Sequence, residues 1–258
     1  MPSGAAYPGT QAVLRALALL KSFTDDRPEL GLADLAQAAN LNKTTAYRLL
    51  TALEQEGLVS RNTQTDAYRL GPEMIVLGGR ATRANDLRRV SHAELESLAG
   101  QTGETATLEI LSEMQVLTLD EVPGSYLMSV AHDIGSRWPL HAASTGKALL
   151  AHMPAAALEA MLQQPLASFT PKTVTDPASL RRQLAQIRRQ GYAVAAEELE
   201  VGFVALGAPV LNHNGQVVAA ISVGGPSARL TRKKIPELAG LVTASAGRIS
   251  ASLGYKAD

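Results

Sequence analysis

The chain contains no cysteine, and this absence removes several kinds of chemistry. A structural disulfide, a thiol nucleophile and a cysteine-ligated zinc site are all impossible. No apolar run reaches about 18 residues, so no membrane-spanning helix is expected. The five histidines show none of the spacings typical of metal ligands. The sequence therefore predicts no metal, no cofactor and no membrane partner, and it favours a cytoplasmic location.

A net charge is also lacking, because 24 lysines and arginines balance 24 aspartates and glutamates. Proteins with a large nucleic-acid footprint are often basic, so only a small local basic surface is compatible with this balance. The 258 residues are 46 % hydrophobic, which allows one large or two modest domains. Residues 1–9 are small, polar and contain proline. They predict a disordered tail rather than a signal peptide.

Residues 30–70 have the pattern of a winged helix-turn-helix. Residues 32–39 form a run of good helix formers, which Asn40-Leu41 interrupts with a side chain that tolerates left-handed turns. Asn42 suits the N-cap of a second helix, which should run from Lys43 to about Glu56 and end at Gly57. The segments that follow predict a β-hairpin wing around residues 62–66, and Leu30 can add a short third strand.

The second helix of this pattern separates apolar from polar side chains. Its apolar face holds Ala46, Leu49, Leu50 and Leu53. The other side offers the hydroxyls, phenol and guanidinium group that base edges and phosphates bind, and the wing adds two arginines. The candidate DNA-binding residues are Lys43, Thr44, Thr45, Tyr47, Arg48, Thr51, Arg61 and Arg69. The alternative is a three-helix packing module whose polar face is only solvated.

Two further helical segments flank this motif. Residues 11–23 predict a helix with Thr10 as its cap and with Val13, Leu14, Leu17 and Leu20 facing inward. Residues 71–86 predict a linker helix that Gly78-Gly79 interrupts. The apolar face of this linker exceeds what a free linker needs, so it could pack against its counterpart in a dimer or against its own domain.

From residue 87 onward the pattern is α+β, with short turns that predict an antiparallel sheet and flanking helices. The predicted strands are 105–111, 116–122, 126–132, 205–211 and 216–223. The predicted helices are 87–100, 145–152, 155–163, 177–190 and a last helix that starts near Ile235 with Pro236 as its first helical residue.

Two segments of this second half concern chemistry. Small and hydroxylated residues crowd the helix start at 142–148, where free amides attract an anion such as a carboxylate. Close helix packing also favours small residues there, so both interpretations stay open. A phosphate-binding P-loop is excluded, because His141 stands where it requires glycine and Ala148 where it requires a hydroxyl. Glu197, Glu198 and Glu200 lack partners at defined spacing and predict a solvated loop.

Several motifs in order resemble the IclR family of bacterial transcription regulators over nearly the whole chain. In the first half these are Gln11 to Leu17, Leu32 to Ala36 and Thr44 to Leu58. In the second half they are Pro139 to Ala142, Ser144 to Ala151, Gly191-Tyr192, Ala208-Pro209-Val210 and Ser222 to Pro226.

The resemblance implies a winged helix-turn-helix domain (10–70), a linker helix (71–86) and a GAF-like effector-binding domain (87–258). It also implies dimers or dimers of dimers on double-stranded, pseudo-palindromic operators. A small organic or aromatic acid would control DNA occupancy. By position, the effector-binding residues are Met128, Leu140, Ser144, Thr145, Gly146, Ala195, Ala205, Ser222 and Gly224.

The chain departs from the family pattern at two of these positions. Ala195-Ala196 stands where many members carry an acidic residue, and Ala205 stands where many carry cysteine. This predicts a less polar and roomier pocket, for a ligand with an apolar or aromatic body and one anionic group.

The expected function is a ligand-responsive DNA-binding regulator of a metabolic operon, a repressor or, alternatively, an activator. A small-acid-processing enzyme with an appended helical domain is the first alternative, but no nucleophile–base pair or metal cluster supports it. A protein-binding adaptor, in which the winged domain docks a partner, is the second. The chain is therefore expected not to be an enzyme.

Overall fold

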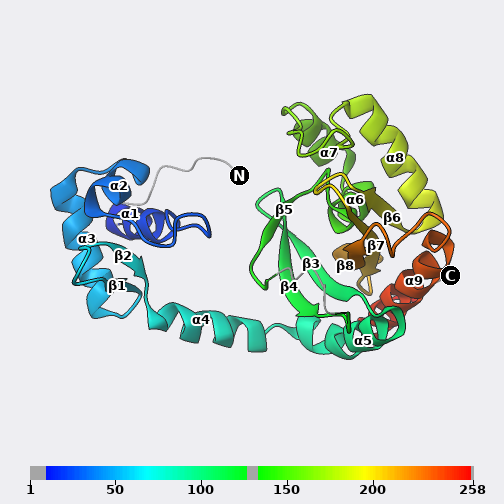
Figure 1. The fold of residues 1–258 in the computed structure, drawn as a ribbon, viewed down its shortest axis with the longest axis horizontal. Helices are drawn as coiled ribbons and strands as arrows, with labels where there is room; N and C mark the ends of the chain where they lie inside the picture. The colour runs from blue at the N-terminus through cyan, green and yellow to red at the C-terminus, as the bar shows by residue number, and fades with distance from the viewer. Residues whose placement is uncertain (1–9, 127–132, 257–258) are drawn as a thin grey trace. The chain divides into compact units, whose positions relative to one another are not determined.

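The computed structural model describes residues 10–126 and 133–256, and the chain divides into two compact units that meet between Ala84 and Asn85. The predicted strand at 126–132 therefore lies almost wholly outside the described residues. Each unit has a hydrophobic core of its own, and Figure 1 shows the helices and strands that make up each unit. No helix of the described residues is long and apolar enough to cross a membrane.

The N-terminal unit is the predicted winged helix-turn-helix. Its elements are α1 (Gln11–Leu20), α2 (Leu32–Ala38), α3 (Lys43–Gln55), β1 (Val59–Arg61), β2 (Tyr68–Leu70) and α4 (Pro72–Arg83). Asn40 adopts a left-handed conformation with φ of 53°, and Gly57 ends α3 with φ of +69°. Asn42 caps α3, since its Oδ1 accepts a hydrogen bond of 2.8 Å from the Thr45 amide. β1 and β2 pair antiparallel, and Leu30 adds a single bridge to Tyr68.

The prediction for α1 is wrong for three of the four residues expected to face inward, and right for Leu20. Leu19 is fully buried, and Ala16 and Leu20 pack beside it, whereas Val13, Leu14 and Leu17 are exposed by 59 %, 51 % and 46 %. The helix also ends at Leu20 rather than Phe23, and Thr10 makes no side-chain capping hydrogen bond. Because α1 is apolar on more than one side, periodicity could not decide which side α2 and α3 would cover.

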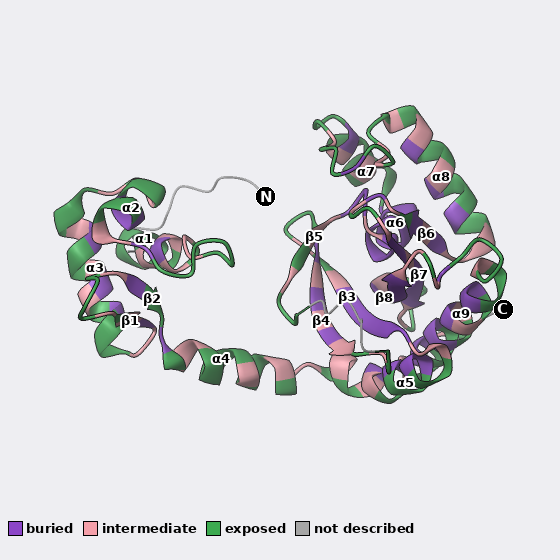
Figure 2. Ribbon diagram, viewed as in Figure 1, coloured by how far each residue is buried: buried purple, intermediate pink, exposed green. Residues whose placement is uncertain are grey.

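The linker segment also differs from its prediction, because α4 continues through Gly78-Gly79 without a break. Glycine lowers helix stability by roughly 1 kcal/mol relative to alanine but leaves the backbone hydrogen bonds in place. None of the α4 side chains is buried, and the helix is green and pink along its length in Figure 2. Ile75 is 79 % exposed, so the apolar side of α4 has no cover within the described part of this chain.

The C-terminal unit is built on a six-stranded antiparallel sheet of order β5-β4-β3-β8-β7-β6 among the described residues. Its strands are β3 (Thr105–Ser112), β4 (Gln115–Val122), β5 (Arg137–Pro139), β6 (Ala193–Ala196), β7 (Phe203–Leu211) and β8 (Val217–Pro226). The helices are α5 (Asp86–Thr102), α6 (Ser144–Ala151), α7 (Ala155–Leu162), α8 (Pro177–Gln190) and α9 (Ile235–Ser252). The sequence missed β5 and β6, which are short edge strands. The start of α9 at Ile235, with Pro236 in its first turn, is confirmed.

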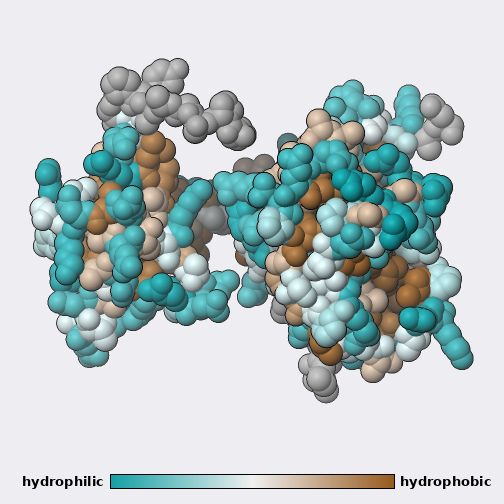
Figure 3. All heavy atoms as spheres, turned by 90° about the horizontal axis from the view of Figure 1, so that it is seen from above, coloured by the Kyte–Doolittle hydropathy of each residue, from teal (hydrophilic) through white to brown (hydrophobic). Residues whose placement is uncertain are grey.

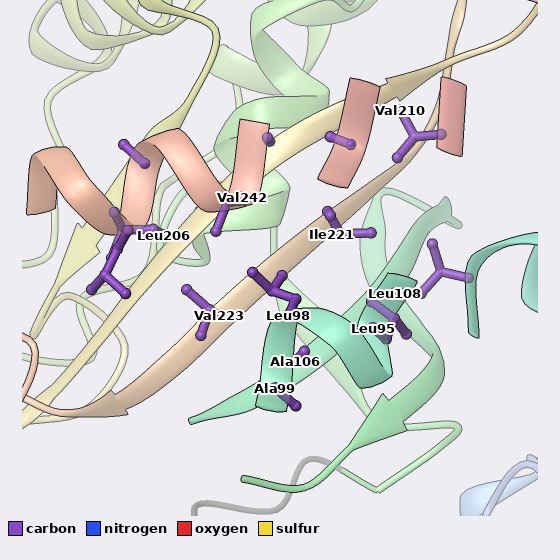
Figure 4. Packing of buried hydrophobic residues seen from close by; sticks show 14 of the residues in the cluster. Leu95, Leu98, Ala99, Ala106, Leu108, Leu206, Val210, Ile221, Val223 and Val242 are labelled. Atoms are coloured by element: carbon purple, nitrogen blue, oxygen red, sulfur yellow. The ribbon is translucent and has the colours of Figure 1, made fainter. Parts of the chain in front are cut away.

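Helices cover both faces of this sheet. α5 and α9 pack on one face, where leucines and valines of the strands and helices interlock (Figure 4). α6 lies against the other face and contacts α8. Along β3, Ala106 and Leu108 enter the α5–α9 core, so Thr105, Thr107 and Glu109 must point toward α6. The polar face of β3 is thereby enclosed.

Candidate functional site

The polar side of α3 is open to solvent in the N-terminal unit. Lys43, Thr44 and Arg48 are exposed, and the ring of Tyr47 is 46 % exposed. Thr45 and Thr51 are half-buried, and the Thr51 hydroxyl donates a hydrogen bond of 2.9 Å to the Tyr47 carbonyl oxygen. The four exposed side chains, Lys43, Thr44, Tyr47 and Arg48, are therefore free to reach a ligand, whereas the Thr51 hydroxyl is already bonded to the backbone of α3.

The two wing arginines lie beside carboxylates. Arg61 is 3.1 Å from Asp66 and stacks 5.5 Å from the centre of the Tyr68 ring. Arg69 is 3.9 Å from Glu29. Such exposed pairs contribute little to stability, so a phosphate group could replace the carboxylate at small cost. The wing thus presents two guanidinium groups, each of which is weakly paired with one carboxylate.

A cavity in the C-terminal unit gathers residues from both the sheet and α6. Six of the nine effector-binding candidates line it: Ser144, Thr145, Ala195, Ala205, Ser222 and Gly224. Its other lining residues are Thr105, Thr107, Glu109, Trp138, Ala142, Ala143, Leu199 and Phe203. The cavity is small: its free volume is about 30 Å³, enough for roughly two waters.

The remaining candidates lie elsewhere. A Cβ on Gly146 would come within 2.3 Å of the Leu140 carbonyl oxygen, so Gly146 serves close packing. Leu140 is buried in the core around α6 and borders a separate apolar groove rather than the cavity. Met128 lies outside the described residues. The roomy pocket expected from Ala195 and Ala205 is not observed, since the free space is only about 30 Å³.

Among the lining residues that sequence reasoning missed, Glu109 is the only ionisable one in the described part of the chain. It is almost fully buried, and Thr145 on α6 donates its hydroxyl to Oε2. Thr118 donates to Oε1 over 3.3 Å and accepts a bond of 3.2 Å from the indole nitrogen of Trp138. Burial raises the pKa of Glu109 above its ordinary range, and these hydroxyls oppose the shift. The alternation Thr105-x-Thr107-x-Glu109 was the available signal, although it resembles an ordinary solvent-facing strand.

Close backbone approach holds α6 against the sheet at this cavity. A Cβ on Gly207 of β7 would lie 2.9 Å from the backbone of Ser144 and Thr145, so only glycine fits without a shift. Thr107 and Ser222 share a hydrogen bond of 2.8 Å across β3 and β8. The hydroxyl-lined cavity is thus fixed by a helix that touches the strands directly.

The predicted solvated loop at 197–200 is wrong for Glu198. This side chain is buried, and both its oxygens lie 2.5 Å from Nζ of the fully buried Lys147 on α6. Gln183 accepts a third bond from Lys147 over 3.0 Å. Glu197, in contrast, pairs with the exposed Lys172. Within the described residues no group of three metal-ligating side chains occurs.

Two family matches cover most of the chain. Residues 12–63 match the IclR helix-turn-helix domain, and residues 79–251 match the bacterial transcriptional regulator IclR C-terminal domain. The chain belongs to the IclR family of bacterial transcriptional regulators. The predicted fold class and regulator function are thereby confirmed, and α3 lies within the segment that matches the IclR helix-turn-helix domain.

The chain aligns with IclR-family relatives over nearly its whole length and nearly the whole of theirs. The chain is 32 % identical over 251 residues to the HTH-type transcriptional regulator XynR of Escherichia coli, covering 97 % of this chain and 100 % of XynR. It is 30 % identical to the transcriptional repressor IclR of the same organism, covering 98 % and 94 %. An IclR homolog of Microbacterium hydrocarbonoxydans, solved with 4-hydroxybenzoate, is 29 % identical with a TM-score of 0.81 over 94 % and 98 %. These relatives are named as regulators or homologs, not as enzymes.

Proposed function

We propose that this regulator binds a two-fold-related operator as a homodimer, and that a small organic acid in the C-terminal cavity controls its occupancy of that operator. The proposal rests on the cavity at the start of α6, which is lined both by buried hydroxyl groups and by the first turn of a helix. This cavity lies in the unit that follows the helix-turn-helix unit in the chain. Several relatives are named repressors, which favours repression as the resting activity.

Arg48 is proposed to read a base in the major groove, with Lys43 on a phosphate. Selection of genomic fragments by the purified protein, followed by fluorescence anisotropy, would measure this. Arg48→Ala should cost about 1–3 kcal/mol per half-site and relax one position of the selected motif. Lys43→Ala should weaken all sequences alike and lower the salt slope by about 1 per protomer. Arg189→Ala, which removes an exposed charge from α8, is the control, and an unchanged motif in Arg48→Ala would refute the assignment.

The proposed dimer uses the apolar sides of α1 and α4. Val13, Leu14 and Leu17 on α1 and Ile75 on α4 are exposed, and brown hydrophobic surface interrupts the teal of both units in Figure 3. A second copy is the occupant that operator symmetry requires. Sedimentation should give a dimer or a multiple of it, and Leu14→Glu with Ile75→Glu should reduce the mass. Val201→Glu, at a 70 % exposed position of the C-terminal unit, should leave it unchanged.

Effector control can be separated from DNA binding by filling the cavity. Ala205→Leu adds side-chain volume to a space of about 30 Å³. The variant should bind the operator like the wild type and ignore any acid that releases the wild type. A variant that still responds to the acid would place effector binding elsewhere.

A further inference from the structure

We propose that the ligand of the C-terminal cavity carries a cationic nitrogen that pairs with Glu109. The inference specifies the ligand class of the proposed effector site and rests on that proposal. A small acid that also bears an ammonium group is then the best-fitting compound.

Among the described residues, Glu109 is a buried acid without a basic neighbour in its cavity. Only 4 % of the residue is exposed, and no lysine, arginine or histidine is among the described residues that line the space. The buried Lys147 is engaged by Glu198 and does not line the cavity. A buried carboxylate is costly unless it is paired, so a cation in the cavity would stabilise its charge.

The surrounding hydroxyls can stabilise the ionised form of Glu109, since their hydrogen bonds oppose the rise in its pKa that burial causes. Thr145 and Thr118 each donate to a different carboxylate oxygen. The Thr118 oxygen accepts from the Trp138 indole, which directs its proton toward Glu109. Thr107 adds a third hydroxyl contact, and because a carboxylate takes about four such bonds, it can still accept from a donor that enters the cavity. A cationic nitrogen supplies both the missing charge and the missing protons.

The dimensions and neighbours of the cavity limit the rest of the ligand. The free space of about 30 Å³, room for roughly two waters, limits the ligand to a few heavy atoms. Ser144 and Thr145 lie in the first turn of α6, whose amides favour an anionic group beside the ammonium. A compound with the size of a small amino acid meets both requirements.

Matched probes test the charge of the ligand directly. We would compare glycine with glycolate, alanine with lactate, and β-alanine with 3-hydroxypropionate, which replace an ammonium by a hydroxyl. Thermal shift and titration calorimetry on the full chain should show binding by an amino compound but not by its hydroxy partner. Glu109→Gln should weaken that binding roughly tenfold or more, whereas Glu200→Gln, an exposed change in the 197–202 loop, should not.

Proton release gives a second readout. Glu109 is the only titratable side chain among the described lining residues, and burial raises its pKa. At a pH below the folded pKa of Glu109, a cation that ionises this side chain should release a proton on binding, measured as a dependence of the binding heat on the buffer. Glu109→Gln should abolish this dependence.

The outcomes separate this inference from the effector function. Equal binding of amino and hydroxy compounds, stabilisation by sodium or potassium chloride alone, or no binding by any amino compound would overturn the inference. An acid without nitrogen that binds and alters operator occupancy would overturn it and leave the effector function intact. An amino compound that binds through Glu109 without altering operator occupancy would support the inference and refute effector control.

Discussion

Breaking the buried pair of Lys147 and Glu198 should strongly destabilise the C-terminal unit. Lys147 is fully buried on α6, and three oxygens of Glu198 and Gln183 surround its ammonium within 3.0 Å. Burial lowers the pKa of Lys147 below its usual range, and the Glu198 carboxylate opposes that shift. Lys147→Met keeps most of the length of the side chain but removes the ammonium group, so the buried Glu198 carboxylate loses its cationic partner.

Removing one member of a buried ion pair costs about 3–5 kcal/mol. With a urea slope of about 2.5 kcal/mol per M, the unfolding midpoint should fall by roughly 1.5 M. The chain has a single tryptophan, Trp138, which lies in the C-terminal unit, so its fluorescence follows that unit alone. Adding Glu198→Leu to Lys147→Met should recover most of the loss, since no unpaired charge then remains.

Lys172→Met is the matched control, because Lys172 is exposed and pairs with the adjacent Glu197. It should change the free energy of unfolding by less than about 1 kcal/mol. A Lys147→Met protein within about 1 kcal/mol of the wild type would refute the reasoning. A double variant no more stable than Lys147→Met would refute it as well.

Three further predictions concern single side chains. Burial raises the pKa of Glu109 in the folded protein above its ordinary 4.5. As the pH rises above 4.5, the unfolded chain loses the Glu109 proton while the folded chain keeps it. The free energy of unfolding therefore falls until the pH reaches the folded pKa. Glu109→Gln should therefore raise the melting temperature at neutral pH and leave it unchanged near about pH 4. Asn42→Ala removes the α3 cap and should lower the stability of the N-terminal unit by about 1 kcal/mol in circular-dichroism melts, while Asn214→Ala in the β7–β8 turn should not affect that unit. Gly207→Ala should displace α6 and cost about 1–3 kcal/mol by Trp138 fluorescence, whereas Gly240→Ala, with open space around it, should be tolerated.

Local signals explain which predictions succeeded. Asn40, Asn42 and Gly57 act on amides within a few residues of themselves, so the turn, the cap and the end of α3 were readable without tertiary contacts. The hairpin at Asn212 to Gly215 and the boundaries of α8 follow from the same kind of signal. The family motifs likewise indicated nine effector-binding candidates, and six of them line one cavity.

The sequence by itself determined most elements of this protein, their order and the family to which the chain belongs, but not the short edge strands β5 and β6. Tertiary structure alone decided which apolar side of α1 is covered, because that choice depends on α2 and α3 rather than on periodicity. It also enclosed Glu109 and paired Lys147 with a glutamate 51 residues away. Charged side chains in a strand or loop are normally solvated, and only the packing of α6 against the sheet removes their water. The electrostatic character of the cavity is therefore a property of the fold.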